Sequence, residues 1–196
     1  MKRKYLLLLA SLVLATFLAV LLYTEVPPTP VSAFNHPWVN YLSTNVLPAE
    51  RGLWDDTPAG VPSEAALLWF VNNQALNETV GYKTTEVAIS SNNFPILRAR
   101  ADITDGMDFR VGYATSATAP CIFPAALVWP NAQANDGYSI KSFTLPANTS
   151  VKAICIWETD NLDAINFGRT ATLIDYIKLQ NAAGATGWSE EFAGSP

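Results

Sequence analysis

The chain of 196 residues has few of the residue types from which most catalytic sites are built. It contains a single histidine, His36, so neither a histidine-based metal triad nor a Ser-His-Asp arrangement can be assembled. It also lacks a phosphate-binding loop, a dinucleotide fingerprint, a GxSxG elbow and an HExxH helix. A hydrolase with two catalytic carboxylates stays open, because spacing in the sequence cannot locate such a pair. These absences favour a protein that is not an enzyme.

Charged residues are also scarce, at 15% of the chain. Three of the 12 Lys and Arg lie at positions 2–4, and one of the 17 Asp and Glu lies at position 25. The rest of the chain therefore has 9 basic and 16 acidic residues, a net charge of −7. This balance argues against nucleic acid or anionic lipid as a partner, because both need a basic surface. It fits neutral ligands and divalent cations.

An almost unbroken apolar run extends from Tyr5 to Tyr23 behind the basic residues. A helix of this length rises about 28 Å, close to the thickness of a bilayer's hydrocarbon core. Residues 1–23 are therefore either a signal anchor or a signal peptide, and Val31-Ser32-Ala33 offers small residues for cleavage. Residues 24–33 are a stiff, proline-rich spacer. Both alternatives place the following domain outside the cytoplasm, secreted or on the cell surface.

Alternation of apolar and polar residues predicts strands in most of the remaining chain. Between Leu97 and Ile103 it predicts a half-buried strand whose wet face carries Arg98, Arg100 and Asp102. The Asp-Gly turn at 104–106 predicts a hairpin to the next strand, Phe109 to Tyr113. The apolar residues on both faces of 151–158 indicate a central, covered strand. Further strands are predicted at 85–89, 138–145 and 172–179. Residues 65–71, after Pro62-Ser63-Glu64, are either an N-capped short helix or a buried strand, and the β-like pattern of the rest of the chain favours the strand.

Short strands with turn residues between them predict an all-β fold, an antiparallel β-sandwich over residues 34–181. Residues 182–196 read as a polar C-terminal tail. Cys121 and Cys155 form an even pair, which predicts a disulfide in an exported chain. The alternative is that Cys155 is a small buried residue. The sequons at Asn77 and Asn148 predict N-glycosylation sites.

Two acidic clusters are candidate Ca²⁺ sites, because calcium takes hard oxygen ligands from loops. The alternative is that these residues serve turn geometry, which favours Asp. The first cluster comprises Asp102, Asp105 and Asp108, and the second Glu158, Asp160 and Asp163.

Aromatic residues in loops are candidate sugar platforms, because a ring can cover the apolar face of a sugar. Trp129 and Trp54 lie beside Asn or Asp in such segments, and Asn131 and Asn135 are placed to bind hydroxyls near Trp129. The alternative is that these rings close the ends of the sandwich.

Four segments between Val80 and Leu179, about half the chain, resemble jelly-roll carbohydrate-binding modules of the family 6 and 35 type. Residues 85–102 correspond to their strand, turn and strand, and residues 108–113 continue this match. Residues 143–148 correspond to their "LPAG" turn, and residues 173–179 correspond to their closing strand. The resemblance implies a galactose-binding-like jelly roll, sugar recognition by loop aromatics, and a structural Ca²⁺ held partly by Asp175. Leu173 stands where those modules frequently have a sugar-binding asparagine.

We therefore expect an extracellular, non-catalytic domain whose partner is a carbohydrate or cell-surface glycan. The membrane would be a second partner through residues 5–23 if that segment is not cleaved. Two alternatives stay open: a structural subunit of a cell-surface layer or extracellular filament, which would self-associate, and a glycan-active hydrolase.

Overall fold

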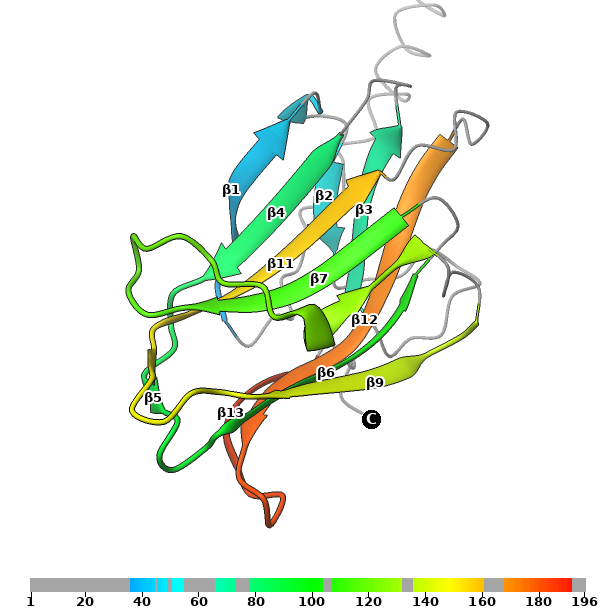
Figure 1. Cartoon of the computed structure of the whole chain (residues 1–196). Helices are drawn as coiled ribbons and strands as arrows, with labels where there is room; N and C mark the ends of the chain where they lie inside the picture. The colour runs from blue at the N-terminus through cyan, green and yellow to red at the C-terminus, as the bar shows by residue number, and fades with distance from the viewer. Residues whose placement is uncertain are drawn as a thin grey trace, which may run out of the picture. The chain divides into compact units, whose positions relative to one another are not determined.

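Two antiparallel β-sheets face one another across a shared core in the computed structural model (Figure 1). The structure describes residues 36–44, 46–48, 51–54, 66–72, 78–103, 107–131, 136–160 and 168–191. The predicted signal segment and spacer, residues 1–33, lie outside these ranges. The helix in the described part, η2 (Ala125–Leu127), is a single short turn, and nothing helical there has the length and apolar character of a membrane span.

The five-stranded sheet comprises, in order, β1 (Val39–Thr44), β4 (Thr79–Thr84), β11 (Ala153–Asp160), β7 (Met107–Ala114) and β8 (Val128–Trp129). The six-stranded sheet comprises β2 (Arg51–Trp54), β3 (Ala66–Asn72), β12 (Gly168–Gln180), β6 (Ile96–Ile103) and β9 (Ser139–Thr144), with β13 (Thr186–Glu191) also paired to β12. A small sheet joins β5 (Ile89–Ser90) to β10 (Ser150–Val151). The predicted β-fold is thus confirmed, including a strand rather than a helix at 65–71.

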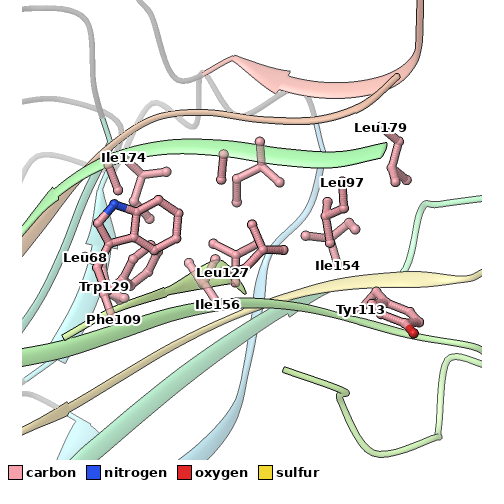
Figure 2. Packing of buried hydrophobic residues seen from close by; sticks show 14 of the residues in the cluster. Leu68, Leu97, Phe109, Tyr113, Leu127, Trp129, Ile154, Ile156, Ile174 and Leu179 are labelled. Carbon is pink, nitrogen blue, oxygen red and sulfur yellow. The ribbon is translucent and has the colours of Figure 1, made fainter. Parts of the chain in front are cut away.

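The core lies between the two inner sheet faces, because successive strand residues point to opposite sides of a sheet. In β6 every second residue is buried, and Arg98, Arg100 and Asp102 alternate with them on the outer face, as predicted. Burying a large apolar side chain contributes about 1.5–3 kcal/mol. Figure 2 shows the packed side chains of both sheets and of η2, among them Phe109, Trp129, Leu127, Ile156, Leu68, Leu97 and Ile174.

The predicted hairpin between β6 and β7 is wrong. These strands belong to opposite sheets: β6 pairs with β12 and β9, whereas β7 pairs with β11 and β8. Both strands have an apolar face, and the chain buries the two faces against each other by crossing between the sheets instead of pairing the strands edge to edge. Local turn chemistry at 104–106 could not distinguish a hairpin from such a crossing.

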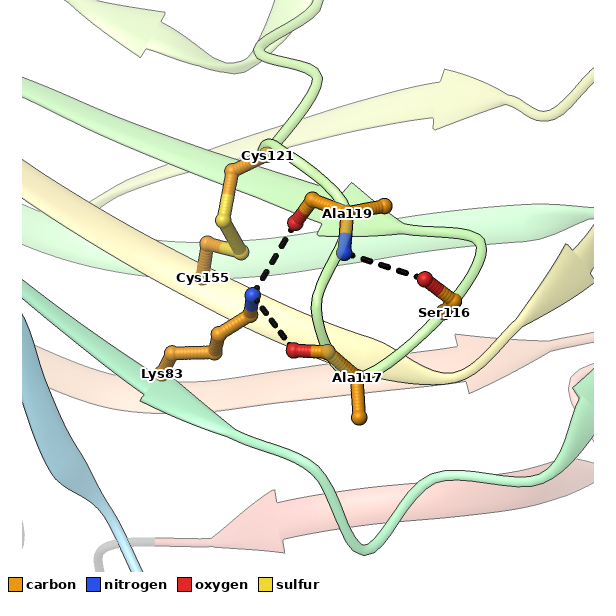
Figure 3. Close-up of a disulfide and its surroundings, with 6 residues drawn as sticks. All are labelled: Lys83, Ser116, Ala117, Ala119, Cys121 and Cys155. Carbon is orange, nitrogen blue, oxygen red and sulfur yellow. Dashed lines mark hydrogen bonds between the residues drawn. A yellow bond between two sulfur atoms is a disulfide. The ribbon is translucent and has the colours of Figure 1, made fainter.

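Strand β11 is central, between β4 and β7, and is covered on both faces, as predicted. The segment after β7 folds back over its outer face, where Cys121 is bonded to Cys155 with 6.3 Å between the Cα atoms (Figure 3). The buried Lys83 Nζ donates to the carbonyl oxygens of Ala117, at 2.9 Å, and Ala119, at 3.0 Å. The disulfide and this lysine therefore hold one loop to the sheet.

Glycine at position 112 makes room for the same loop. A Cβ atom there would lie 2.5 Å from the Ile122 carbonyl oxygen and 2.7 Å from the Phe123 ring. Phe123 in turn packs edge-on against Trp157, with 5.1 Å between the ring centroids. The position of this loop thus depends on the absence of a side chain at Gly112 as well as on the Cys121–Cys155 disulfide.

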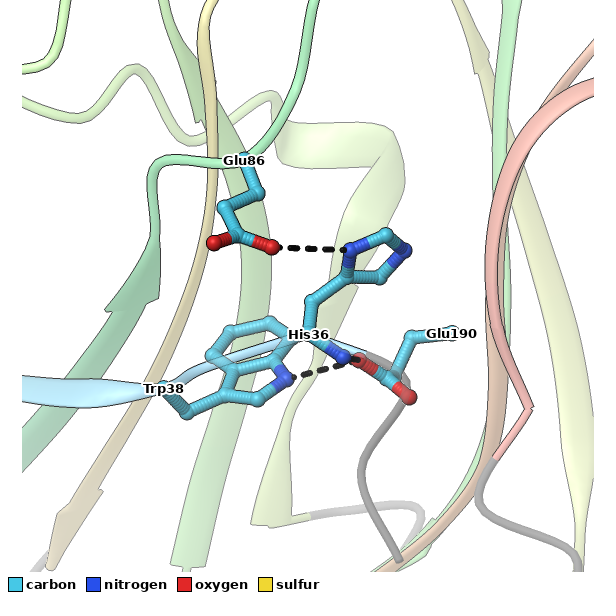
Figure 4. Close-up of polar contacts among 4 residues, drawn as sticks. All are labelled: His36, Trp38, Glu86 and Glu190. Carbon is cyan, nitrogen blue, oxygen red and sulfur yellow. Dashed lines mark hydrogen bonds and ion pairs between the residues drawn. The ribbon is translucent and has the colours of Figure 1, made fainter.

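The predicted polar tail, residues 182–196, is wrong as far as residue 191, because this segment contains β13. Trp188 of β13 is buried in the core, and Glu190 is buried beside it. The Glu190 carboxylate accepts the main-chain N–H of His36 at 3.2 Å and the indole N–H of Trp38 at 3.0 Å (Figure 4). The His36 ring stacks on Trp188, with 5.0 Å between centroids. These contacts thus join the segment that leads into β1 to strand β13.

Removing the disulfide should destabilise the fold by about 3–4 kcal/mol, on the chain-entropy estimate for a closed loop of this length. We expect this loss in urea unfolding of the variant in which Cys121 and Cys155 are both replaced by alanine. The wild type under reducing conditions should lose a similar amount. Equal stability of the wild type with and without reductant would contradict the bond.

Candidate ligand-binding face

Trp129 is not an exposed sugar platform, and this prediction is wrong for the protein as folded. The side chain is 1% exposed, and its indole N–H donates to Ser139 Oγ at 2.7 Å. Its ring packs against Phe109, with 5.4 Å between centroids, and Lys141 Nζ lies 5.3 Å from its centroid. An aromatic side chain that can satisfy its one donor inside the sandwich gains more from burial than from exposure. The alternative, a ring that closes the core, is the correct one.

Of the other predicted sugar contacts, the structure describes Asn131. The main-chain N–H of Asn131 donates to Asp108 Oδ1 at 2.9 Å. Asn135 and the side chain of Trp54 lie outside the described residues, as does Asn77. Asn148 is exposed in a turn at a positive φ of 61°, and its main-chain N–H and side-chain oxygen bond to the Asn92 side chain. Glycosylation at Asn148 stays a prediction.

The acidic side chains predicted as calcium ligands are dispersed where the structure describes them. Asp175 forms an ion pair with Arg100, and Asp108 Oδ2 lies 3.9 Å from Arg110. Glu158 lies in the interior and Asp102 on the outer face of β6. Asp105, Asp163 and the side chain of Asp160 are not described. Within the described ranges no three His, Cys, Asp or Glu side chains form a group that could hold a metal ion, so calcium binding stays a prediction.

Glu158 is a buried carboxyl group whose Oε1 accepts the Thr172 hydroxyl at 2.6 Å. Its Oε2 has no hydrogen-bond partner among the residues that the structure describes. Burial raises the pKa of Glu158 from 4.5 to about 8, and the Thr172 hydrogen bond lowers it by less. The group is therefore protonated at neutral pH, as expected for a carboxyl group in an apolar core. Full burial also keeps it from contact with a ligand.

The outer face of the six-stranded sheet carries a group of charged and aromatic side chains that lie close together. Register pairs Arg100 of β6 with Tyr176 of β12 on one side and with Ile140 of β9 on the other. Lys178 lies across from Arg98 in the same way. We call this surface the Arg100 face, and it comprises Arg98, Arg100, Asp102, Tyr138, Asp175, Tyr176, Lys178 and Glu191.

A β-bulge in β12 builds the centre of this face. The register with β6 shifts between Ile174 and Tyr176, so Asp175 is the extra residue. Ile174 and Ile177 are buried, whereas Asp175 and Tyr176 between them are both half-buried. A bulge re-aims side chains in this way. Two consecutive residues of β12 therefore reach the outer face beside Arg100.

Arg100 is held in place from two directions. Its guanidinium carbon lies 4.5 Å from the centroid of the Tyr138 ring, and Nη1 pairs with Asp175 Oδ2. The hydrogen bond to Asp175 raises the pKa of Arg100, so the group stays charged. The Arg100 side chain is nevertheless 39% exposed and that of Asp175 19%. A planar guanidinium group that is bonded to Asp175 on one edge and has other N–H groups accessible is suited to a ligand with many hydrogen-bond acceptors.

The Arg100 face carries equal numbers of cationic and acidic side chains. Lys178 Nζ lies 2.8 Å from Glu191 Oε1 and 4.6 Å from the Tyr176 ring centroid. The buried atoms Arg98 Nε and Asp102 Oδ1 have no hydrogen-bond partner in the described part of the chain, and burial raises the pKa of Asp102. The three cations, Arg98, Arg100 and Lys178, thus face three carboxylates, Asp102, Asp175 and Glu191.

Sequence reasoning found part of this face. The alternation in β6 predicted Arg98, Arg100 and Asp102 together on a wet surface. Asp175 was implied only as a calcium ligand, and Tyr138 and Tyr176 were missed. A signal for Tyr176 exists, because strict alternation through 172–179 cannot bury Ile174, Ile177 and Leu179 together without a bulge.

No family model matches the chain, and no curated protein sequence does. Among solved structures the chain is similar to the glycoside hydrolase domain of Endo-D from Streptococcus pneumoniae R6, at 11% identity and a TM-score of 0.44 over 74% of this chain and 21% of that one. It is also similar to the enzymatically active domain of tailspike protein 4 of bacteriophage CBA120, at 13% identity and a TM-score of 0.38 over 70% and 19%. A third is CsCBM6-3 from Clostridium stercorarium in complex with cellobiose, at 13% identity and 0.35 over 71% and 89%. The chain spans about a fifth of the first two proteins, and similarities this distant assign it neither a family nor a ligand.

Trp129→Ala should lower the free energy of unfolding by about 3–5 kcal/mol, because it removes a fully buried aromatic side chain and leaves a cavity. Trp129→Phe should cost less, since it keeps much of the apolar volume. Chemical unfolding measures both. A near-wild-type midpoint for the alanine variant would show that the ring is not part of the core.

Glu158 should make the fold less stable as pH rises. The unfolded carboxyl loses its proton near pH 4.5 and the folded one near pH 8, so stability is full below pH 4.5 and falls between these values. The total loss is on the order of 5 kcal/mol if the whole shift is realised. Glu158→Gln, which keeps an acceptor for Thr172, should flatten this fall in urea unfolding between pH 5 and pH 8. An unchanged slope in the variant would contradict the assignment.

Proposed function

We propose that this chain is an extracellular, non-catalytic β-sandwich domain of jelly-roll type that binds a neutral carbohydrate on its Arg100 face. The observation that carries the proposal is the Arg100 guanidinium, oriented by the Tyr138 ring and the Asp175 carboxylate yet open to solvent. Residues 5–23 deliver the domain to the outside and, if uncleaved, attach it to the membrane.

The chemistry of the face suits hydroxyl groups. A sugar hydroxyl donates one hydrogen bond and accepts others, so it can bridge the Arg100 N–H groups and the free lone pairs of Asp175. Both protein groups are charged, which strengthens each bond, and their mutual contact fixes their geometry before a ligand arrives. Rings at Tyr138 and Tyr176 border the pair with apolar surface.

Charge balance favours a neutral ligand over a polyanion. Three cations and three carboxylates share the Arg100 face, and the chain as a whole carries a net charge of −5. A polyanion would be repelled over distances up to a Debye length, about 8 Å at physiological salt. A neutral polyhydroxylated chain meets no such barrier.

The disulfide supports the extracellular assignment. Bonds such as Cys121–Cys155 persist in oxidising compartments and are rare in the cytosol. The absence of catalysis is proposed because Glu158, the described carboxyl group with the strongly raised pKa, is sealed in the core.

The edge strands favour this proposal over a filament built by strand addition. Strand β1 pairs only with β4 among the described strands, and Val39 is 56% exposed, but a bulge between Asn40 and Leu42 interrupts its register. Strand β9 carries Lys141, whose Nζ turns inward and donates to the Val128 carbonyl oxygen at 2.6 Å. Bulges and inward-pointing charges are common devices that protect sheet edges from pairing with another chain.

Affinity electrophoresis in gels that contain neutral polysaccharides tests the proposal. The wild type should be retarded by at least one of them, with a dissociation constant on the order of millimolar to micromolar. Arg100→Gln and Tyr138→Ala should each weaken retardation about tenfold or more, the loss of roughly 1.4 kcal/mol of contact energy. Their melting temperatures should change little, since an exposed ion pair contributes about 0–1 kcal/mol.

Lys152→Gln is the matched control. It removes one positive charge, as Arg100→Gln does, from an exposed residue between β10 and β11, and should leave retardation unchanged. Equal retardation of wild type, Arg100→Gln and Tyr138→Ala, or none by any polysaccharide, would contradict carbohydrate binding on this face.

A further inference from the structure

Resting on the proposed function, we infer that Ile140 makes the Arg100 face selective for sugars that carry a methyl group, as 2-acetamido sugars and 6-deoxy sugars do. Arg100 and Asp175 bind hydroxyl groups of any of these sugars. Ile140 adds an apolar contact beside them, and a hexose without a methyl group uses that contact less well.

Ile140 is an exposed apolar residue directly across from Arg100. It is 50% exposed, and the register of β9 with β6 pairs the two residues. Residues paired in this way have Cβ atoms about 4.5–5.5 Å apart on the same face of a sheet. Ser139 and Lys141, the chain neighbours of Ile140, both reach inward and bond to groups of β8. Ile140 therefore projects outward, next to the Arg100 side chain.

The position of Ile140 distinguishes it from the other exposed apolar residues. An exposed apolar side chain is ordinary on its own. Among the described large apolar residues, Val39, Leu47 and Ile122 are also exposed, but none of the three belongs to a strand of the six-stranded sheet. Of these four residues, Ile140 is the one that a ligand bound to the Arg100 guanidinium can contact.

The surroundings of Arg100 differ on its two sides. Toward β12 it meets the Asp175 carboxylate and Tyr176. Toward β9 it meets Ile140, and the Tyr138 ring lies two residues before Ile140 along the chain. A sugar that bonds to the guanidinium and to the carboxylate therefore turns its opposite edge toward Ile140. The substituent on that edge decides how well the sugar fits.

A methyl group is the substituent that suits this position. Contact between a methyl group and Ile140 removes apolar surface of both from water, which is favourable in proportion to the area. A hydroxymethyl group in the same place would lose hydrogen bonds to water, and the isoleucine side chain has no donor or acceptor to replace them. One methylene in a closed pocket changes affinity by roughly 10–200-fold, so a half-exposed contact should give about three- to tenfold.

Ligand-observed NMR titration of the full chain with matched sugars tests the inference. Each set keeps one stereochemistry: glucose, N-acetylglucosamine and 6-deoxyglucose, and the same three forms of galactose and of mannose. In the set that binds, a methyl-bearing form should bind at least about threefold more tightly than the parent hexose. The form that gains affinity shows whether the methyl group belongs to an acetamido group or to C6.

Three variants test the role of Ile140. Ile140→Ser should lower the affinity for the preferred form to that for the parent hexose, whose own affinity should stay nearly unchanged. Ile140→Val keeps an apolar side chain and should retain most of the preference. Val39→Ser is the matched control, because it makes a similar change at a residue of the other sheet that is 56% exposed, and it should leave all affinities unchanged.

The outcomes separate the two claims. Equal affinities for all three forms of each sugar, with binding still lost in Arg100→Gln, would overturn the selectivity and leave carbohydrate binding intact. A preference that survives Ile140→Ser would overturn the role of Ile140. Binding of none of the sugars would overturn the inference and, if polysaccharides also cause no retardation, the proposed function as well. Circular dichroism and the melting temperature establish that each variant is folded.

Discussion

Burial of alternate residues of β6 is the constraint on which the candidate site depends. Leu97, Ala99 and their neighbours on the inner face are fully buried, and the period of two then forces Arg98, Arg100 and Asp102 to the outer face. A slip of one residue would bury three charged groups, each at a cost of several kcal/mol, so the core fixes the register firmly. The same packing that stabilises the fold therefore also sets the spacing of the site.

The bulge in β12 shows how a small irregularity converts a regular sheet into a site. Without it, Tyr176 would point inward and Ile177 outward, so the core would lose an apolar side chain. With it, Ile174 and Ile177 both stay buried, and Asp175 reaches Arg100 from the adjacent strand. Packing and site geometry thus favour the same local distortion, which is typical of bulges near functional residues.

Features that depend on the local sequence could be predicted, whereas features that depend on contacts between distant parts of the chain could not. The alternation predicted β6 and its solvent-facing side, because period-two patterns follow directly from burial on one side. Apolar residues on both faces predicted β11, whereas periodicity alone could not distinguish a helix from a strand at β3. The crossing from β6 to β7 was missed, because the same turn residues serve a hairpin and a sheet change. The burial of Trp129 was only an alternative in the sequence analysis, because its partner, Ser139, lies ten residues away and on another sheet. The strand at 186–191 was missed because Trp188 and Glu190 acquire partners only in the folded protein.

Cations on the aromatic rings determine how the Arg100 face can bind. Arg100 lies over one face of the Tyr138 ring, and Lys178 lies over one face of the Tyr176 ring. That face of each ring is therefore not available for stacking against a sugar. Recognition by hydrogen bonds from an oriented guanidinium then outweighs stacking on a ring. Such bonds replace bonds to water and contribute only about 0.5–3 kcal/mol each. Useful affinity on the Arg100 face would therefore require several such bonds to one ligand, which a group of charged residues can supply and a single aromatic residue cannot.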